Sequence, residues 1–285
     1  MKRMVLACLL AAALGAVAAA PLACQRVPTT GQRAFIVLSW DQETALGREA
    51  GPELEKEFGN PLDNLPVQAY VRAVGQRVAG AVRHADLPKL PYQFTVLDSD
   101  VVNAFALPGG PVYVTRGLLG NLKTEGQLAA VLAHEITHIN SRHGSQQISR
   151  QMGIQILLAA AAAAAGRTES GAKMATQAED LAKVVVGLIN MKYSRGMESE
   201  ADRFGLDYLA ASGYDPREMV NLLNVFVSMA GSRPPEILST HPNPEARVGA
   251  VEEMIRAKYP NRGGRVADEE YRREVLNRLK VAKSL

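Results

Sequence analysis

The sequence predicts an α+β fold that is mostly helical and contains a small β-sheet. Apolar residues recur at helical spacing over much of the chain, for example at Val67, Val71, Val74 and Val78. Between residues 92 and 115, short runs rich in Val, Tyr, Phe and Thr are typical of strands. Of the 285 residues, 47% are hydrophobic, which is enough to bury a sizeable core.

The N-terminal segment indicates an exported protein. Met1-Lys2-Arg3 is a short basic start, and an alanine-rich apolar run follows from Met4 to Ala20. This pattern is typical of a signal peptide. The alternative is a membrane anchor, since the run approaches the ~20 residues that span a bilayer. Export is favoured because nothing after Cys24 resembles a stop-transfer segment.

The end of this segment resembles that of a bacterial lipoprotein signal. Leu22-Ala23-Cys24 has the expected order, although Pro21 stands where such signals carry an aliphatic residue. We therefore expect residues 1–23 to be removed and Cys24 to carry lipid. Gln25 then suggests the outer membrane of a two-membrane cell, facing the periplasm. Cys24 would be the only cysteine left, which excludes an internal disulfide.

The charge of the mature chain excludes a basic surface for nucleic acid. The formal net charge is +3, and it falls to +1 when Lys2 and Arg3 are removed with the signal. We expect no nucleic-acid partner, and the oligomeric state cannot be inferred from the sequence.

The elements follow in order along the chain. We expect a tether over residues 24–40, then one domain over 41–285. Its first helices are expected at 41–58 and 65–82, and its strands at 92–97, 103–107 and 112–115. Pro108-Gly109-Gly110 has the composition of a turn between the last two strands.

The rest of the chain is expected to be helical. Thr124 and Gln127 have the spacing of a capping box, so a helix should begin there. Further helices are expected at 145–165 and 198–211, and Asp215-Pro216 opens another. The most apolar stretch, 154–165, is too short to span a membrane. A packed helix is favoured there, with an interfacial helix as the alternative.

One motif on the helix after Thr124 carries chemistry. His134 and His138 are four residues apart, so their side chains share a face and can hold one ion, while Glu135 can reach a water on it. Zinc suits two imidazoles in a tetrahedral site. A chance match on an exposed helix is the alternative, but apolar residues such as Leu132 and Ile136 indicate a packed helix.

A catalytic zinc site needs a third protein ligand. His143 is turned ~140° from His138 on a helix, which favours a surface or capping role. Glu198 and Asp202 share a helix face, while Glu200 points nearly opposite and suits a solvated face. Periodicity does not decide between Glu198 and Asp202.

Four motifs together resemble the HtpX/CAAX-prenyl-protease family of gluzincin metallopeptidases, over about residues 41–254. They are His134-Glu135-Ile136-Thr137-His138, the run from Asn103 to Gly110, Glu198 with Asp202, and Ser239-Thr240-His241-Pro242. The soluble periplasmic members are the most similar, since the membrane-spanning helices of HtpX are missing. The resemblance implies a zincin-like metallopeptidase fold with the small sheet beside the active-site helix.

The resemblance also implies roles for single residues. Glu198 would be the third zinc ligand, and Asp202 would orient a ligand histidine. His241 and Arg247 match positions near the metal and are candidates to stabilise the oxyanion. The histidine also has a second possible role, as a gate that fills the open zinc position in a resting enzyme. The segment Asn103, Ala104, Phe105 and Ala106 would be an edge strand that pairs with an extended substrate.

The sequence thus predicts a zinc endopeptidase with one Zn²⁺ per chain and Glu135 as general base. By resemblance, its substrates would be misfolded or unassembled envelope proteins, and a lipid anchor would hold it to the membrane. A zinc-stabilised, chaperone-like lipoprotein that assists outer-membrane assembly is the alternative function. Keeping Glu135 argues against it, because a structural zinc site has no use for that carboxylate. An integral membrane protease for prenylated substrates is disfavoured by the missing spans.

Overall fold

The computed structural model describes residues 24–164, 187, 192–231 and 234–282, with side chains omitted over 155–164 and 281–282. The expected mostly helical α+β fold with small sheets is confirmed. The expected signal peptide lies outside the described residues. The helices are α2 (Trp40–Phe58), α3 (Leu65–Ala79), α4 (Arg116–Leu119), α5 (Glu125–Asn140), α6 (His143–Ala164), α8 (Arg195–Ala211), α9 (Arg217–Met229), α10 (Ile237–Thr240), α11 (Pro244–Lys258), α12 (Asp268–Tyr271) and α13 (Asn277–Ala282), the last two joined by a π-helical turn (Arg272–Leu276).

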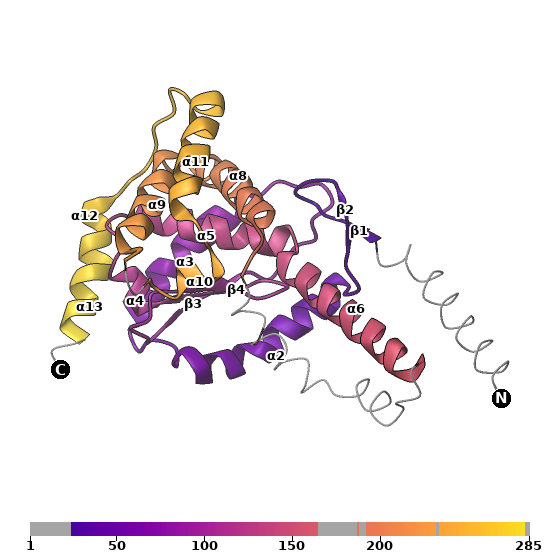
Figure 1. Ribbon diagram of the computed structural model, residues 1–285. Coiled ribbons are helices and arrows are strands. Elements are labelled where there is room, and N and C mark those ends of the chain that lie inside the picture. The colour runs from indigo at the N-terminus through magenta and orange to yellow at the C-terminus, as the bar shows by residue number, and fades with distance from the viewer. Residues whose placement is uncertain (1–23, 165–186, 188–191, 232–233, 283–285) are drawn as a thin grey trace, which may run out of the picture.

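Helix α5 is the centre of the fold, and every one of its residues is buried. Helices α8 and α9 pack on one side of it, and α3 and the three-stranded sheet pack on the other (Figure 1). Its start follows Thr124, as the sequence predicts, because the Thr124 side chain accepts a hydrogen bond from the backbone N–H of Gln127. The expected capping box is only half formed, since the Gln127 side chain accepts from the N–H of Lys123 and not from that of Thr124. A helix buried on all sides holds the side chains it carries in fixed positions.

The main sheet contains β3 (Gln93–Leu97), β5 (Pro111–Thr115) and β4 (Ala104–Ala106), in the order β3-β5-β4. Strand β4 is antiparallel to β5 and forms an edge of the sheet, whereas β3 runs parallel to β5. The sheet therefore offers β4, and not β5, to a segment that approaches from outside.

The turn between β4 and β5 is built on glycine, as its composition indicates. Gly109 and Gly110 have φ angles of 81° and 140°, which residues with a Cβ rarely adopt. A Cβ on Gly109 would also lie 2.3 Å from the Cα of Thr44 in α2. The predicted hairpin is thus confirmed, and its tip is packed tightly against α2.

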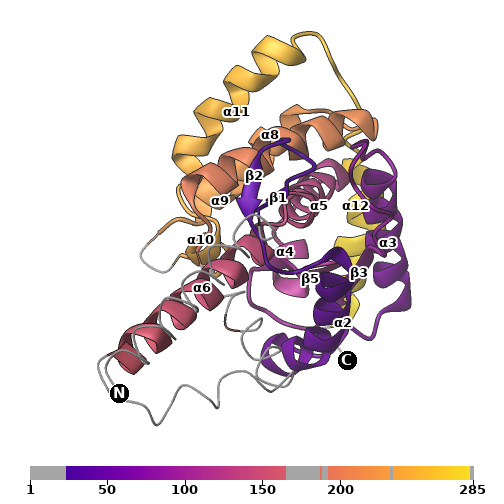
Figure 2. The same ribbon diagram turned by 90° about the vertical axis from the view of Figure 1, so that its right-hand side faces the viewer.

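Residues 24–40, expected to be a tether, contain a two-stranded antiparallel sheet of β1 (Cys24–Arg26) and β2 (Arg33–Phe35). This hairpin packs where α5 ends and α6 begins, and α6 then extends away from the helical body (Figures 1 and 2). Of the helices in the described part of the chain, none has the length and hydrophobicity to cross a bilayer.

Candidate metal centre

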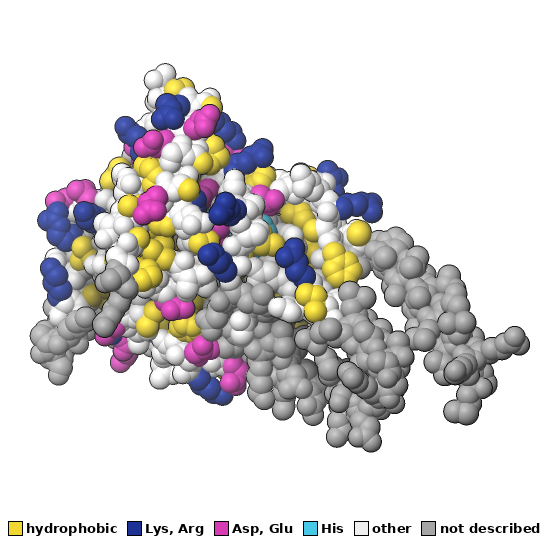
Figure 3. Space-filling model, in the orientation of Figure 1, with side chains coloured by type: hydrophobic (Ala, Val, Ile, Leu, Met, Phe, Trp, Pro, Cys, Tyr) yellow, Lys and Arg dark blue, Asp and Glu magenta, His cyan; other side chains and the backbone are white. Residues whose placement is uncertain are grey.

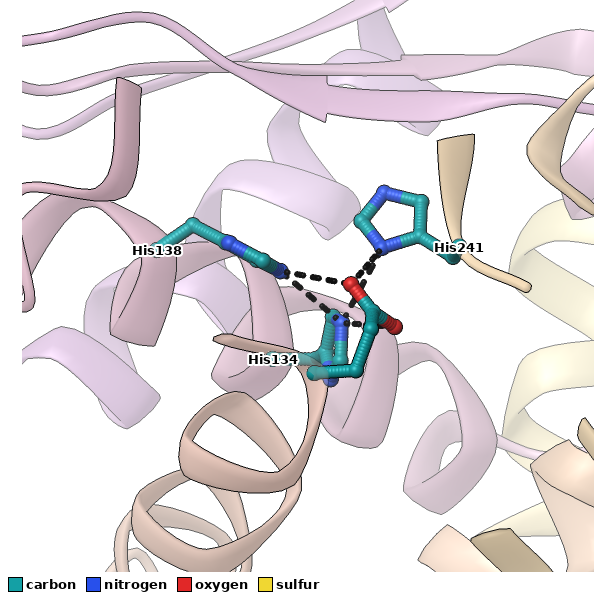
Figure 4. Close-up of side chains that lie close together, drawn as sticks. His134, His138 and His241 are labelled. Atoms are coloured by element: carbon teal, nitrogen blue, oxygen red, sulfur yellow. Dashed lines mark hydrogen bonds and ion pairs between the residues drawn. The ribbon is translucent and has the colours of Figure 1, made fainter. Parts of the chain in front are cut away.

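The two histidines of the motif face one another on α5, as their spacing predicts. The Nε2 atoms of His134 and His138 are 3.1 Å apart, and both side chains are almost fully buried. His241 lies at the end of α10 and points its ring toward the same place (Figure 4). Its Nδ1 is 3.2 Å from Nε2 of His134.

Helix α8 brings a carboxylate to these rings. Oε2 of Glu198 lies 3.6 Å from Nε2 of His134, and Oε1 of Glu198 lies 3.5 Å from Nε2 of His138. This approach depends on Gly205, two turns further along α8. A Cβ at that position would lie only 3.2 Å from the backbone nitrogen of His134. The helices therefore cross closely, and Glu198 is held against the motif.

Four side chains together fit a metal ion. One ligand atom from each of His134, His138, Glu198 and His241 can be chosen so that all four lie within 4.8 Å of one another. Burial lowers the pKa of His138 well below its usual value, which keeps the ring neutral and able to coordinate. Although burial opposes ionisation, His241 and His138 hold the pKa of Glu198 well below its usual value. Two or three imidazoles with one carboxylate are a donor set that zinc accepts.

The ring edge of His134 that faces away from His138 and His241 is held by a charged network. Its Nδ1 is 3.1 Å from Oδ1 of Asp202, as the resemblance implies. Arg247 lies beside both, donating from Nε to Oδ2 of Asp202 at 2.8 Å and pairing through Nη1 with Oε2 of Glu198 at 2.7 Å. Burial raises the pKa of Asp202, but Arg247 outweighs it, and the net shift is downward. The guanidinium is thus engaged by two carboxylates, which favours a positioning role over direct contact with an oxyanion.

The side of His138 that faces away from the other ligand candidates is held by a second chain of contacts, which corrects one expectation. His143, expected at the surface, is buried, and its Nδ1 is 2.9 Å from Nδ1 of His138. Its Nε2 is 3.2 Å from Oε2 of Glu200, whose side chain stays 35% exposed, as expected of a solvated helix face. The helix angle between His138 and His143 misled because α5 ends at Asn140 and the chain turns at Arg142, where φ is 55°.

Glu135 lies beside the cluster in a position suited to a base. Its side chain is 2% exposed, and Oε2 has no hydrogen-bond partner among the described residues. Burial raises its pKa, opposed by His241 and His134. Oε1 is 3.6 Å from Nε2 of His241. An unsatisfied buried carboxylate oxygen costs free energy unless another group, such as a water, binds it.

Tyr193 is a site residue that the sequence reasoning missed. Its ring lies 3.9 Å from that of His138 at an interplanar angle of 30°, and its backbone N–H donates to the carbonyl of Thr240. It therefore packs on the ring of His138 while tying the start of α8 to the turn that carries His241. Its position just before Ser194, the N-cap of α8, was the available signal.

The edge strand β4 borders the site. A small hollow is lined by Ala106 of β4 together with His138 and Tyr193. Backbone bonds to β5 are made by residue 103 at one end and residue 107 at the other. Because antiparallel bonding alternates, the peptide groups of Ala104 and Ala106 face away from β5, and the N–H of Ala104 donates to Oδ1 of Asn103 at 3.0 Å. These groups are the ones that an added strand would use. Phe105, in the same predicted segment, is buried against Tyr113.

The helix motif, the carboxylate from a second helix and the buried carboxyl beside them define a metal-dependent peptidase. The chain belongs to peptidase family M48, whose model matches residues 66–255. The expected family resemblance is thereby confirmed.

Curated relatives agree with this assignment. The chain is 36% identical over 235 residues to the beta-barrel assembly-enhancing protease of Escherichia coli (strain K12), a match that covers 78% of this chain and 45% of the relative. It is 30% identical over 233 residues to the mitochondrial metalloendopeptidase OMA1 of Schizosaccharomyces pombe, covering 80% of this chain and 66% of the relative. It is 29% identical over 165 residues to the metalloprotease YcaL of Escherichia coli, covering 58% and 63%. The chain thus spans about half the length of the first of these relatives.

Proposed function

We propose that the protein is a zinc-dependent endopeptidase of the bacterial cell envelope. The observation that carries this proposal is the convergence of His134, His138 and Glu198 beside Glu135, whose Oε2 is buried without a partner among the described residues. A structural metal site would leave that oxygen unsatisfied for no gain. One bound Zn²⁺ would supply Lewis-acid activation of the scissile carbonyl and of a water molecule.

Residues of the chain would transfer the proton, stabilise the oxyanion and bind the substrate. Glu135 would accept a proton from the attacking water and later donate it to the leaving amine, and its raised pKa suits both steps. His241, whose Nε2 faces Glu135 at 3.6 Å, would donate to the oxyanion. An extended substrate would pair with the peptide groups of Ala104 and Ala106 at the edge of the sheet.

His241 would also gate the site in the resting enzyme. Its Nδ1 is 3.0 Å from Oε1 of Glu198 and belongs to the group of four possible ligand atoms. It lies on the turn between α10 and α11, where Asn243 adopts a left-handed conformation. Movement of that turn would withdraw the ring and open a position for water.

Export and anchoring complete the proposal. Residues 1–23 would direct export, and lipid on Cys24, which is exposed, would hold the protein to the outer membrane. Misfolded or unassembled envelope proteins are the proposed substrates, in keeping with the name of the beta-barrel assembly-enhancing relatives.

The test compares zinc content and casein cleavage in wild type and Glu135→Gln. Cleavage that Glu135→Gln abolishes while zinc is retained supports the peptidase. Stoichiometric zinc without cleavage in wild type would favour the chaperone-like alternative. Mass spectrometry of the mature N-terminus tests the anchor separately, because Cys24→Ser should leave the protein without lipid.

A further inference from the structure

The N-terminal hairpin presents one outward face that carries both Cys24 and exposed apolar side chains. In the register of β1 and β2, Cys24 lies opposite Phe35 and Arg26 lies opposite Arg33. Directly opposed residues of an antiparallel pair point to the same side of the sheet. All four are exposed, and Val37 continues the alternation on the same side.

Helix α6 extends this face. The ring of Phe35 lies against Gly153 of α6, because a Cβ on Gly153 would lie 3.6 Å from that ring. The neighbouring residues of Gly153, Met152 and Ile154, are 37% and 44% exposed. Of the six large hydrophobic side chains that are exposed in the described part of the chain, four lie here: Phe35, Val37, Met152 and Ile154. Beyond Ile154 the sequence of α6 continues with a single polar residue, Gln155, up to Ala164. Met152 and Ile154 flank Gly153 on either side of the helix, with Phe35 over the glycine between them. Exposed apolar side chains gathered in this way mark an interaction site.

The opposite face of the hairpin is fixed to the catalytic body. The buried side chain of Arg142 donates to Oε1 of Gln25 at 2.6 Å and to the carbonyl of Leu38 at 2.6 Å. Thr29 bonds Ser141 at 2.8 Å, and the N–H of Val37 donates to Ser149 at 2.9 Å. Ser141 and Arg142 directly follow α5, so the hairpin cannot turn without moving the end of the metal-binding helix.

Two observations identify the occupant of the outward face. Cys24, which carries lipid in the proposed function, lies directly opposite Phe35, so an acyl chain on it would begin beside the apolar side chains. Arg33 and Arg26, which also pairs with Asp86 at 3.5 Å, border the apolar side chains with positive charge. Figure 3 shows hydrophobic and basic side chains side by side over this region. Apolar side chains edged by arginine suit a bilayer surface with anionic headgroups.

We infer that this face, formed by Cys24, Phe35, Val37, Met152 and Ile154 with Arg26 and Arg33 at its edge, rests on the lipid bilayer and fixes the orientation of the active site above it. The lipid on Cys24 belongs to the proposed function, but the contact of Phe35 and Ile154 with lipid does not require it.

Tryptophan quenching by brominated lipid tests this contact on the full chain. Trp40 is the single native tryptophan, so its emission serves as a constant background. Phe35→Trp adds a reporter on the face, and Leu65→Trp adds a matched reporter at another exposed position on α3, 79% exposed in the native chain. Both are bound to vesicles of phosphatidylethanolamine and phosphatidylglycerol, with and without dibrominated acyl chains. We expect several-fold stronger quenching of the added emission for Phe35→Trp than for Leu65→Trp.

Equal quenching of the two reporters would overturn the inference. So would self-association of Phe35→Trp in the absence of vesicles that buries the added tryptophan, because it would assign the face to a second copy of the chain. Peptidase activity of Phe35→Trp on a soluble peptide should match that of wild type. This assay tests the proposed peptidase function separately from the contact with the bilayer. If mass spectrometry shows a mature N-terminus without lipid, the proposed anchor is wrong. The quenching result still tests whether this face contacts the bilayer.

Discussion

His143 is expected to control zinc affinity through His138. For Nε2 of His138 to coordinate, its Nδ1 must carry the proton, and that N–H then donates to Nδ1 of His143 at 2.9 Å. In His143→Phe this donor is buried without an acceptor. The zinc-free protein can avoid the cost by moving the proton to Nε2, whereas the zinc-bound protein cannot. The cost of ~1–3 kcal/mol therefore falls on the bound state and predicts an affinity about 5- to 150-fold weaker.

The assay is zinc affinity measured by competition with a chelator, alongside thermal unfolding of the zinc-free protein. Loss of an outer hydrogen-bond partner of a metal ligand typically costs about 10- to 100-fold in affinity, which agrees with the range above. Glu200→Gln is the matched control, because glutamine keeps an oxygen that can accept from Nε2 of His143, now 3.2 Å away. An affinity of His143→Phe equal to wild type, with unfolding unchanged, would refute the reasoning.

Three further outcomes are expected. Glu198→Ala should lose most of the zinc measured by metal analysis and Asp202→Ala less, and the reverse order would contradict the assignment of ligands. His241→Ala should raise basal peptide hydrolysis and ease zinc removal by chelators if the ring gates the site; activity lowered by ~10²–10³-fold with unchanged chelator resistance would leave only the catalytic role. Arg142→Met should lower the free energy of unfolding by about 3–5 kcal/mol, because Glu43 stays buried without its partner at 2.7 Å. Burial raises the pKa of Glu43, so this loss should shrink as pH falls toward the ordinary value of 4.5, and denaturant titrations that show no such recovery would contradict it.

Much of the fold follows from local sequence signals. The start of α5 at Thr124 and the hairpin around Gly109 were predictable because capping and turn chemistry act within a few residues. Residues 24–40 were not, because β1 and β2 are only three residues each and are fixed by Arg142, more than a hundred residues away. Long-range hydrogen bonds of this kind leave no periodic pattern in the sequence.

The candidate site divides in the same way. Periodicity places His134 with His138 and Glu198 with Asp202, and the structure brings both pairs together. The contact between His143 and His138 was missed because it crosses the end of a helix, where helical angles no longer hold. Tyr193 was missed because its role depends on stacking across elements, which spacing does not encode.

The most direct test of the account is peptide hydrolysis by purified Glu135→Gln, measured together with its zinc content. Glutamine has nearly the same shape as the buried glutamate but cannot accept a proton from water. The account predicts zinc content equal to wild type and no detectable hydrolysis. Hydrolysis at the wild-type rate by the zinc-loaded variant would contradict it.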